Sequence, residues 1–227
     1  MKSTAKNARQ RTASVGTAKW ESPRIPQALL PVELPAEFQR EEAVRMGLVS
    51  DRLIDSQEAD RACFESVIFT NVTFSRNAFS NAEFTDVIFE KCDFSNESFR
   101  ECNIHRAEFR NCKLMGLDLS DSTLRYVLFQ SCSGDYANFR YADMKQVKFE
   151  DCSLRHADFY SSTMLKVDLE RSNLDGAQLS GTKLDGIDLS DCEFTVLGVE
   201  AEDLRGCIIN EGQAAVFASL FGLIIKS

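Results

Sequence analysis

Cysteine is the residue type in this chain whose spacing most strongly suggests chemistry. Eight cysteines occur, and five are separated by multiples of twenty residues: Cys92, Cys112, Cys132, Cys152 and Cys192. A column of thiols could bind a soft metal or form disulfides. At the ~4.8 Å spacing of neighbouring strands, however, stacked side chains lie slightly too far apart for a disulfide. Cysteine also packs as a small buried hydrophobe, so we predict neither a metal site nor disulfides.

The other reactive side chains form no catalytic arrangement. His105 and His156 are the only histidines, and neither has a cysteine or carboxylate at ligand spacing. The sequence contains no Walker loop, no dinucleotide-binding glycine motif, no His-Glu-x-x-His and no Gly-x-Ser-x-Gly. Its carboxylates recur at regular intervals, so no pair stands out as general acid and base. The sequence therefore predicts a protein that is not an enzyme and uses no cofactor.

The positions of these cysteines, histidines and carboxylates follow a repeat with a period of five residues. Every fifth residue from Phe64 to Ile209 is large and apolar except Gly134, which makes 29 apolar residues in 30 positions. Small residues occupy the position two before each of them, and seven of the eight cysteines fall there. The three remaining positions of each five are mostly polar. We expect Gly134 to mark a kink or a thinner side.

A period of five fits neither an α-helix nor an alternating strand. It fits a chain that turns a corner every five residues, so that four sides close a coil of twenty and stacked coils bury one core. The segments Ala107–Asn111, Ala157–Ser161 and Ala177–Gly181 resemble the pentapeptide-repeat family. The resemblance implies an all-β fold, a right-handed quadrilateral β-helix over residues 62–211. About seven and a half coils would make a rod ~36 Å long.

The N-terminal 61 residues divide into a tail and an arm. Residues 1–20 hold five basic residues and no acidic one, which predicts a disordered tail or, alternatively, an organellar transit peptide. Residues 21–61 contain all four prolines and predict an extended arm and N-terminal cap. The apolar register continues faintly through this region and fails at Ala59.

The last residues, 212–227, predict a helical cap. Asn210 and Gln213 fit a helix N-cap and its third-position partner, and Gly222 can end the helix. We expect a short strand after Gly222. The apolar surface of this segment is larger than is needed to cover the end of one coil, and we expect a homodimer to bury the remainder. The expected dimer interface is Phe217, Leu220, Phe221, Leu223 and Ile225.

The C-terminal residues from Leu204 to Ile225 resemble the end of quinolone-resistance and mycobacterial fluoroquinolone-resistance pentapeptide proteins. That resemblance implies a dimer whose acidic rod imitates DNA on DNA gyrase or topoisomerase IV and protects the enzyme from poisons. The unbroken register lacks projecting loops, which makes the mycobacterial type the nearer analogue. The net charge of −9 fits a DNA mimic better than a nucleic-acid binder. Asp118 and Asp158, stacked on one side, are the expected partner-binding acids.

Two further features favour an alternative, a bacterial scaffold or interaction module with an unrelated partner. Exposed tyrosines gather in the middle of the rod, and a short basic stripe follows one corner. No apolar run is long enough to cross a membrane and no export signal is present, so we expect a cytoplasmic protein. The candidate contacts are Tyr126, Tyr136, Tyr141, Arg106, Arg125 and Lys145.

The register predicts opposite effects for neighbouring substitutions. Phe109→Asp should unfold or aggregate the protein, because it buries a charge without a partner. Replacing the adjacent, outward Arg110 should change stability by no more than ~0.5 kcal/mol. Thermal melting of both variants checks the register, which is wrong if both are equally tolerated.

Overall fold

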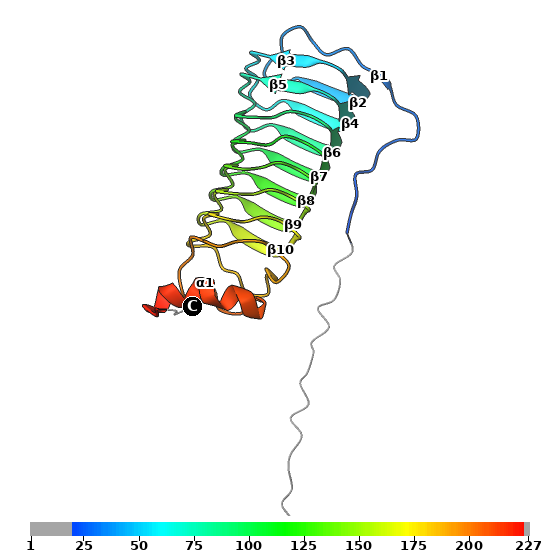
Figure 1. Cartoon of the computed structure of the whole chain (residues 1–227). Helices are drawn as coiled ribbons and strands as arrows, with labels where there is room; N and C mark the ends of the chain where they lie inside the picture. The colour runs from blue at the N-terminus through cyan, green and yellow to red at the C-terminus, as the bar shows by residue number, and fades with distance from the viewer. Residues whose placement is uncertain (1–19, 225–227) are drawn as a thin grey trace, which may run out of the picture.

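The computed structural model describes residues 20–224, apart from the side chain of Ser219. Residues 1–19 of the predicted disordered tail and the expected interface residue Ile225 lie outside this range, whereas Trp20, the last residue of that tail, is described and half-buried. The chain winds into a solenoid whose coils stack along one axis, with an arm at one end and a short helix at the other (Figure 1). All strand pairs are parallel, in the orders β1-β2-β4-β6-β7-β8-β9-β10 and β3-β5. This confirms the expected all-β, right-handed quadrilateral β-helix.

The coil repeats every twenty residues. Strand pairing joins residues twenty apart, as in Val127 with Val147. The short strands are β1 (Leu30–Pro31), β3 (Leu53–Asp55) and β5 (Thr73–Ser75). The eight-residue strands are β2 (Ala43–Ser50), β4 (Cys63–Thr70), β6 (Glu83–Glu90), β7 (Asn103–Arg110), β8 (Thr123–Gln130), β9 (Asp143–Glu150) and β10 (Thr163–Glu170).

Corners recur at every fifth residue, and each uses a left-handed backbone conformation. From Glu41 to Gly186 every corner residue has φ between 47° and 79°, and 26 of these residues are not glycine. Such a conformation costs of order 1–3 kcal/mol outside glycine. The backbone ladder maintains it: for example, the N–H of the corner residue Lys91 donates to the carbonyl of Arg110 in the next coil at 2.9 Å. The fold therefore depends on cooperation between coils.

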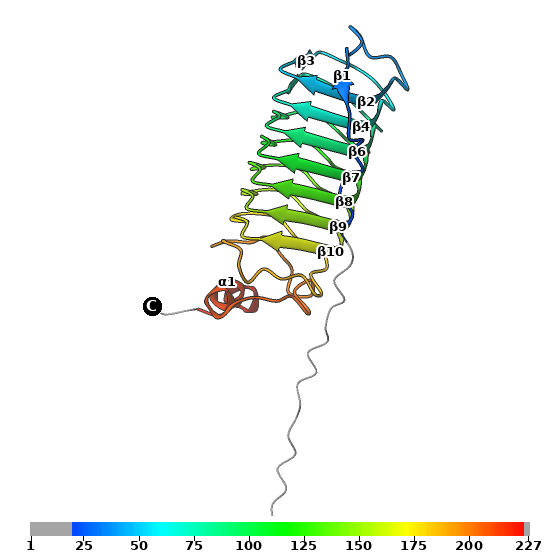
Figure 2. The same ribbon diagram turned by 90° about the vertical axis from the view of Figure 1, so that its right-hand side faces the viewer.

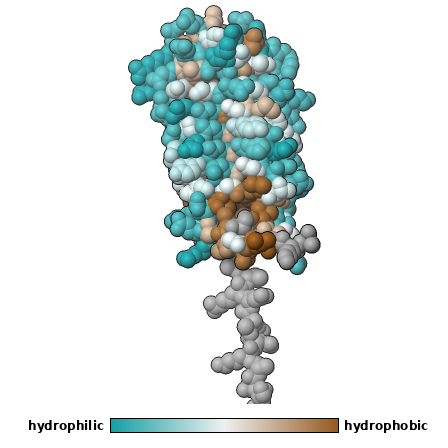
Figure 3. Space-filling view, turned by 60° about the vertical axis from the view of Figure 1, so that its left-hand side comes forward, coloured by the Kyte–Doolittle hydropathy of each residue, from teal (hydrophilic) through white to brown (hydrophobic). Residues whose placement is uncertain are grey.

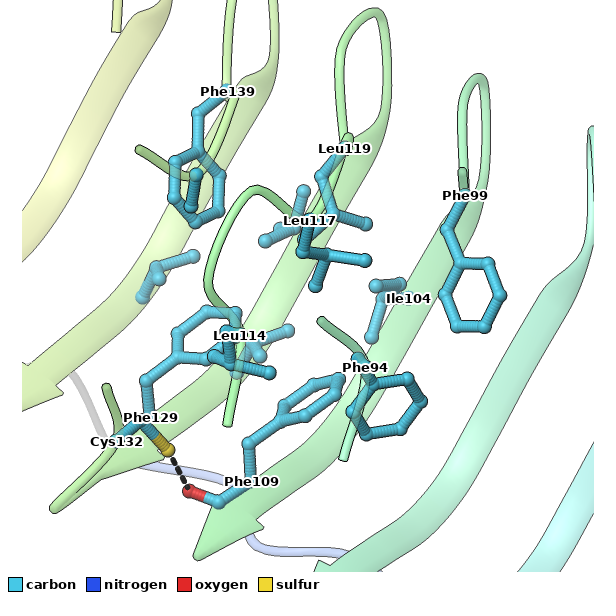
Figure 4. Packing of buried hydrophobic residues seen from close by; sticks show 14 of the residues in the cluster. Phe94, Phe99, Ile104, Phe109, Leu114, Leu117, Leu119, Phe129, Cys132 and Phe139 are labelled. Carbon is cyan, nitrogen blue, oxygen red and sulfur yellow. Dashed lines mark hydrogen bonds between the residues drawn. The ribbon is translucent and has the colours of Figure 1, made fainter. Parts of the chain in front are cut away.

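Phenylalanine columns fill the N-terminal two-thirds of the core. Phe89, Phe109, Phe129 and Phe149 stack in successive coils with centroids 4.7 to 4.8 Å apart. Rings from neighbouring sides meet edge to face, as Phe129 and Phe139 do at 6.1 Å (Figure 4). Both arrangements are favourable for aromatic quadrupoles.

The kink expected at Gly134 is absent. The Gly134 N–H donates to the carbonyl of Ser153 at 2.7 Å, and Ser133 pairs in parallel with residues one coil before and after. The Cδ2 atom of Leu154 lies 3.1 Å from where a Cβ of residue 134 would stand. A side chain from the next coil thus occupies part of the space, and the backbone ladder keeps its register.

The first coil begins about twenty residues before the expected boundary at residue 62. Strands β2 and β3 pair in register with β4 and β5, so residues 43–61 belong to the solenoid. The register fails at Ala59 because Phe38 reaches in from the preceding segment. Its ring lies 5.8 Å from Phe64 and 5.5 Å from Phe79 and is 3% exposed. Phe38 replaces the missing large residue of the first coil.

The C-terminal cap forms as expected up to Gly222. Asn210 and Gln213 make a reciprocal capping box at the start of η1 (Glu211–Gln213), which leads into α1 (Ala214–Ala218) and η2 (Ser219–Phe221). The Gln213 Nε2 donates to two carbonyls of the last coils, at 2.7 and 2.8 Å. Gly222 has φ 69°, and the N–H of Leu223 donates to the carbonyl of Ala218. The expected strand after Gly222 is absent at Leu223 and Ile224.

Arg110 is a poorer control than its outward position suggests. Its guanidinium binds Glu108, whose carboxylate is almost completely buried. Removing Arg110 would leave that charge unpaired, which is costly. Lys113, with 69% of its side chain exposed, is the better outward control for Phe109→Asp.

The position of Phe38 in the first coil predicts that a substitution at residue 59 can restore stability lost by a substitution at residue 38. Phe38→Ala should destabilise the protein by about 3–5 kcal/mol, because it empties an aromatic site in the core. Adding Ala59→Phe should restore much of that loss by refilling the site from the coil itself. Urea unfolding of the single and double variants measures both effects. If the double variant is no more stable than Phe38→Ala, Phe38 does not occupy the site of residue 59.

Candidate functional site

The cysteine column is part of the core. Cys92, Cys112 and Cys132 each donate their thiol to a backbone carbonyl of an earlier coil, at 3.3 to 3.5 Å (Figure 4 shows the last of these). All eight cysteines are free, and the residues that the structure describes contain no group of three potential metal ligands. Cys207 departs from the register prediction, since it is half-buried like Cys63.

Burial raises the pKa of two of the inner thiols and makes them poorer nucleophiles. It raises the pKa of Cys102, which lies outside the column, to about 12, while a backbone hydrogen bond opposes this shift. The same cause raises the pKa of Cys192 to about 12. Reactive cysteines need the opposite shift. Cys152 is an exception within the column, because the hydrogen bond with the Cys132 thiol lowers its pKa. In the structure the column consists of buried core residues whose thiols are hydrogen-bonded to backbone carbonyls.

The two histidines are packed against neighbours on different corners. Burial, followed by the nearby charge of Arg106, lowers the pKa of His105. The ring of His156 stacks on Tyr136 with centroids 5.0 Å apart. His156 also lies over Gly176, where a Cβ would come within 2.3 Å of its Nδ1. A glycine at 176 thus gives this ring its space.

Only part of the expected basic stripe is exposed and free of an ion pair. His105, Arg125 and Lys145 lie side by side on β7, β8 and β9. Arg106, by contrast, is largely buried and binds both oxygens of Asp86 at 2.6 and 2.7 Å. Arg125 is bound to Asp143. Most of the positive charge in the stripe is therefore already paired.

The tyrosines divide between two places. Tyr136 and Tyr141 lie on the two corners that border one side of the coil and are 61% and 51% exposed. Tyr126 lies on a third corner, half-buried beside His105, so it does not join them. The guanidinium of Arg140 lies 4.5 Å from the ring centre of Tyr160 and 5.5 Å from that of Tyr141. We call the resulting surface the aromatic patch: Tyr136, Arg140, Tyr141, His156 and Tyr160.

Asp118 and Asp158 stack on one side of the rod as expected, with Asn138 between them. Each accepts a backbone N–H two residues later in its own turn. Asp158 is also bound by Arg140 at 2.9 Å, and Arg100 approaches Asp118 at 3.9 Å. These acids are therefore partly neutralised by the rod itself.

The densest acidic surface lies elsewhere, in a stretch that the sequence interpretation did not single out. Residues 183–211, which we call the acidic coils, contain eight acidic residues and two basic ones. Ion pairs are frequent from Arg24 to Arg171, but within the described part of the chain none involves residues 183–211. Asp185, Asp188 and Asp191 follow one another around the corner at Gly186. The local excess of acids over bases was the available sequence signal.

An apolar surface adjoins the acidic coils. Leu220, Phe221, Leu223 and Ile224 are 39%, 66%, 62% and 90% exposed. Figure 3 shows hydrophobic residues gathered at this end of the rod, while the rest of that face is mostly hydrophilic. Phe217 differs from the expectation: it is 7% exposed and packs on Phe194, so it belongs to the cap. No helix among residues 20–224 has the length and apolar character needed to span a bilayer.

The solenoid and its repeat define the class of protein. The family model for the pentapeptide repeat region matches residues 60–131, 82–159 and 104–179, which together exceed half of the chain. The chain belongs to the pentapeptide-repeat family. No match was found among curated proteins.

Solved structures of the same fold were also found. Two trypsin-treated variants of QnrB1, a plasmid-mediated fluoroquinolone resistance protein, are 18% and 19% identical, with TM-scores of 0.42 and 0.44. The matches cover 83% and 88% of this chain and 99% and 98% of those chains. HetL, involved in heterocyst differentiation regulation in the cyanobacterium Nostoc sp. strain PCC 7120, is 15% identical over 75% of this chain and 84% of its own, with a TM-score of 0.35. Such TM-scores carry no inference about function.

The buried thiols predict a loss of stability at alkaline pH. A thiol with an ordinary pKa of 9.0 ionises in the unfolded chain, while Cys102 and Cys192 stay protonated in the folded protein up to about pH 12. Their stabilising contribution is complete below pH ~9 and is lost as the pH rises toward 12, by up to ~1.4 kcal/mol per thiol and pH unit. Urea unfolding at several pH values should show this fall. Cys102→Ala with Cys192→Ala should make it shallower, and an unchanged slope would contradict the assignment.

Proposed function

We propose that this protein is a non-enzymatic, dimeric DNA mimic of the bacterial cytoplasm that binds a type II topoisomerase and protects it from poisons. The observation that carries the proposal is the combination of two surfaces at one end of the rod. These are the exposed carboxylates on residues 183–211, which form no ion pair within residues 20–224, and the exposed apolar side chains that follow them. Carboxylates bind a cationic surface built for phosphates, and the apolar surface supports dimerisation.

Charge distribution decides which part of the rod imitates DNA. Along the middle coils, basic side chains reach acids one coil away, as Arg171 does with Asp151 at 2.7 Å. Such pairs offer little net field to a partner. In the acidic coils Asp203 is buried and accepts the N–H of Gly181, but Asp185, Asp188 and Asp191 are exposed. A partner's Arg and Lys side chains would be the first counterions of these three aspartates. Two copies joined at this end would place the acidic coils of both together, at the centre of a rod about 70 Å long.

The resemblance of the C-terminal sequence to quinolone-resistance pentapeptide proteins supports gyrase or topoisomerase IV as the enzyme. The straight, loop-free solenoid favours the mycobacterial type of that group. Asp118 and Asp158 remain candidate contacts, but their arginine neighbours make them weaker ones than Asp185, Asp188 and Asp191.

The aromatic patch supports a second candidate function, a scaffold that binds an unrelated protein. Tyr136 and Tyr141 are exposed, and Arg140 is held between Asp158 and two tyrosine rings. Tyrosine and arginine are enriched where protein interfaces gain most of their binding energy. In this candidate the partner binds the middle of the rod, and loss of the acidic charges leaves binding intact.

Dimerisation can be tested at one residue. Phe221→Glu places a charge in the apolar surface and should convert dimers into monomers in light scattering at micromolar concentration. Leu53→Glu is the matched control, because Leu53 is 65% exposed at the opposite end of the rod and should leave the dimer intact. A wild-type monomer, or equal behaviour of both variants, would refute the interface.

The topoisomerase proposal predicts effects on supercoiling and on drug-induced cleavage by gyrase. Asp185→Asn, Asp188→Asn and Asp191→Asn together should weaken gyrase binding roughly tenfold, since each surface charge contributes about 0.5 kcal/mol. Asp118→Asn with Asp158→Asn should have a smaller effect. Binding should also weaken as salt increases. No effect of the wild type on either reaction at tenfold excess, with several poisons, would favour the scaffold instead.

A further inference from the structure

The N-terminal arm follows one edge of the rod toward the acidic coils. Leu30 and Pro31 pair with β2 in the first coil, and the N–H of Arg24 donates to Asp86 of β6 at 2.8 Å. Glu21 lies close to β7, where its negative charge acts to raise the pKa of both His105 and Arg106. Ten residues of arm thus descend three coils in one direction, passing the edge of one strand after another (Figure 2).

The arm follows a single row of corners. Asp86 and Arg106 are corner residues of this row, and Gly186 is its corner in the acidic coils. The alternating exposure of the arm shows which side faces the rod: Glu21, Pro23 and Ile25 are half-buried, whereas Ser22 and Arg24 are exposed. Only one hydrogen bond joins the described residues 20–29 to the rod.

Residues 1–19, which precede Trp20, are opposite in charge to the acidic coils, toward which the arm runs. Residues 1–19 contain five basic residues and no acidic one. The acidic coils contain eight acidic residues against two basic ones. Four coils separate Arg106 from Gly186, a distance of ~19 Å at the ~4.8 Å strand spacing. A chain of 19 residues can extend to ~60 Å, which is ample.

The charges beside the row narrow the place of contact. Lys166 is the corner residue of the row one coil before Gly186, and Lys145 lies beside the row on β9; both would repel a basic segment. Beyond them, Asp185 and Asp188 lie on either side of the Gly186 corner, and Asp191 lies at the next corner position. Apart from its two chain neighbours, no described residue has a heavy atom within 4 Å of where a Cβ of Gly186 would stand. The corner is therefore open to an incoming chain.

We propose that residues 1–19 bind, within the same molecule, to Asp185, Asp188 and Asp191. The basic segment acts as an internal counterion for the acidic coils. Where this surface also binds a topoisomerase, which rests on the proposed function, the segment competes with the enzyme and reduces its affinity. Exposed carboxylates attract lysines of the same chain at high effective concentration, so a weak contact suffices for substantial occupancy.

Zero-length carbodiimide cross-linking of the full-length protein tests the contact. At low salt we expect amide bonds between Lys2, Lys6 or Lys19 and the three aspartates, read by mass spectrometry. Asp185→Asn, Asp188→Asn and Asp191→Asn together should reduce the yield from the basic segment about fivefold, and 1 M salt, with its ~3 Å Debye length, should do the same.

A matched control removes the same charge elsewhere. Glu58, Glu83 and Glu101 are exposed acids of the early coils for which no ion pair is formed within residues 20–224, and changing all three to Gln should leave the cross-links unchanged. Mixing ¹⁴N- and ¹⁵N-labelled protein distinguishes contact within a molecule from contact between copies. Cross-links chiefly between copies, cross-links spread evenly over the acids of the rod, or no cross-links to the three aspartates would overturn the proposal.

The consequence for binding has a separate test. Lys2, Lys6, Arg9, Arg11 and Lys19, all changed to Gln in the full-length protein, should increase affinity for purified gyrase about threefold to tenfold at low salt. If the wild type and this variant both fail to bind gyrase, the proposed function falls, while the cross-links still decide whether the segment binds the acidic coils. Equal gyrase affinities with cross-links present would overturn the competition.

Discussion

Hydrogen bonding between successive coils is the constraint on which this structure depends. A backbone N–H on one coil donates to a carbonyl of the next, and this register holds from the first coil to the last strands. It places residues twenty apart in almost the same environment. It also maintains left-handed corners at residues that would not otherwise adopt them, such as Tyr136 and Lys166. The columns of phenylalanine and cysteine follow directly from this register.

A ladder of this kind needs different solutions at its two ends. At the N-terminal end, β1 covers β2, and Phe38 and Val32 fill core positions that Ala59 and Gly47 leave open. At the C-terminal end, the Gln213 side chain satisfies two carbonyls and a short helix covers the last coil. The first solution buries its apolar residues. The second leaves Phe221 and its neighbours exposed, which makes this end the part of the rod best suited to bind another molecule.

The same twenty-residue register controls the electrostatics. Oppositely charged side chains one coil apart lie close together, as Arg45 and Glu65 or Arg106 and Asp86 do. Such pairs cancel much of the field of the acidic residues in the first seven coils. The last coils contain few basic residues, so within residues 20–224 their acidic side chains form no ion pairs. Net charge alone therefore does not show where unpaired acidic charge lies on the rod, whereas the arrangement of the ion pairs does.

Sequence periodicity was sufficient to predict the coil and its inward residues, because both depend on contacts that recur at fixed spacing. The capping box at Asn210 could be predicted from a local motif, since its partner Gln213 is three residues away. It could not show that Phe38 stands in for residue 59, since that contact joins segments outside the repeat. For the same reason it missed the burial of Phe217 against Phe194. It also missed the burial of Arg106 against Asp86 and grouped Tyr126 with tyrosines on other corners, because the repeat does not show which outward side chains pair with one another. Inward or outward direction is a local property of the five-residue repeat. Whether an outward side chain is free, paired or covered is decided by neighbours one coil away and by the arm and cap, which only the tertiary structure brings into place.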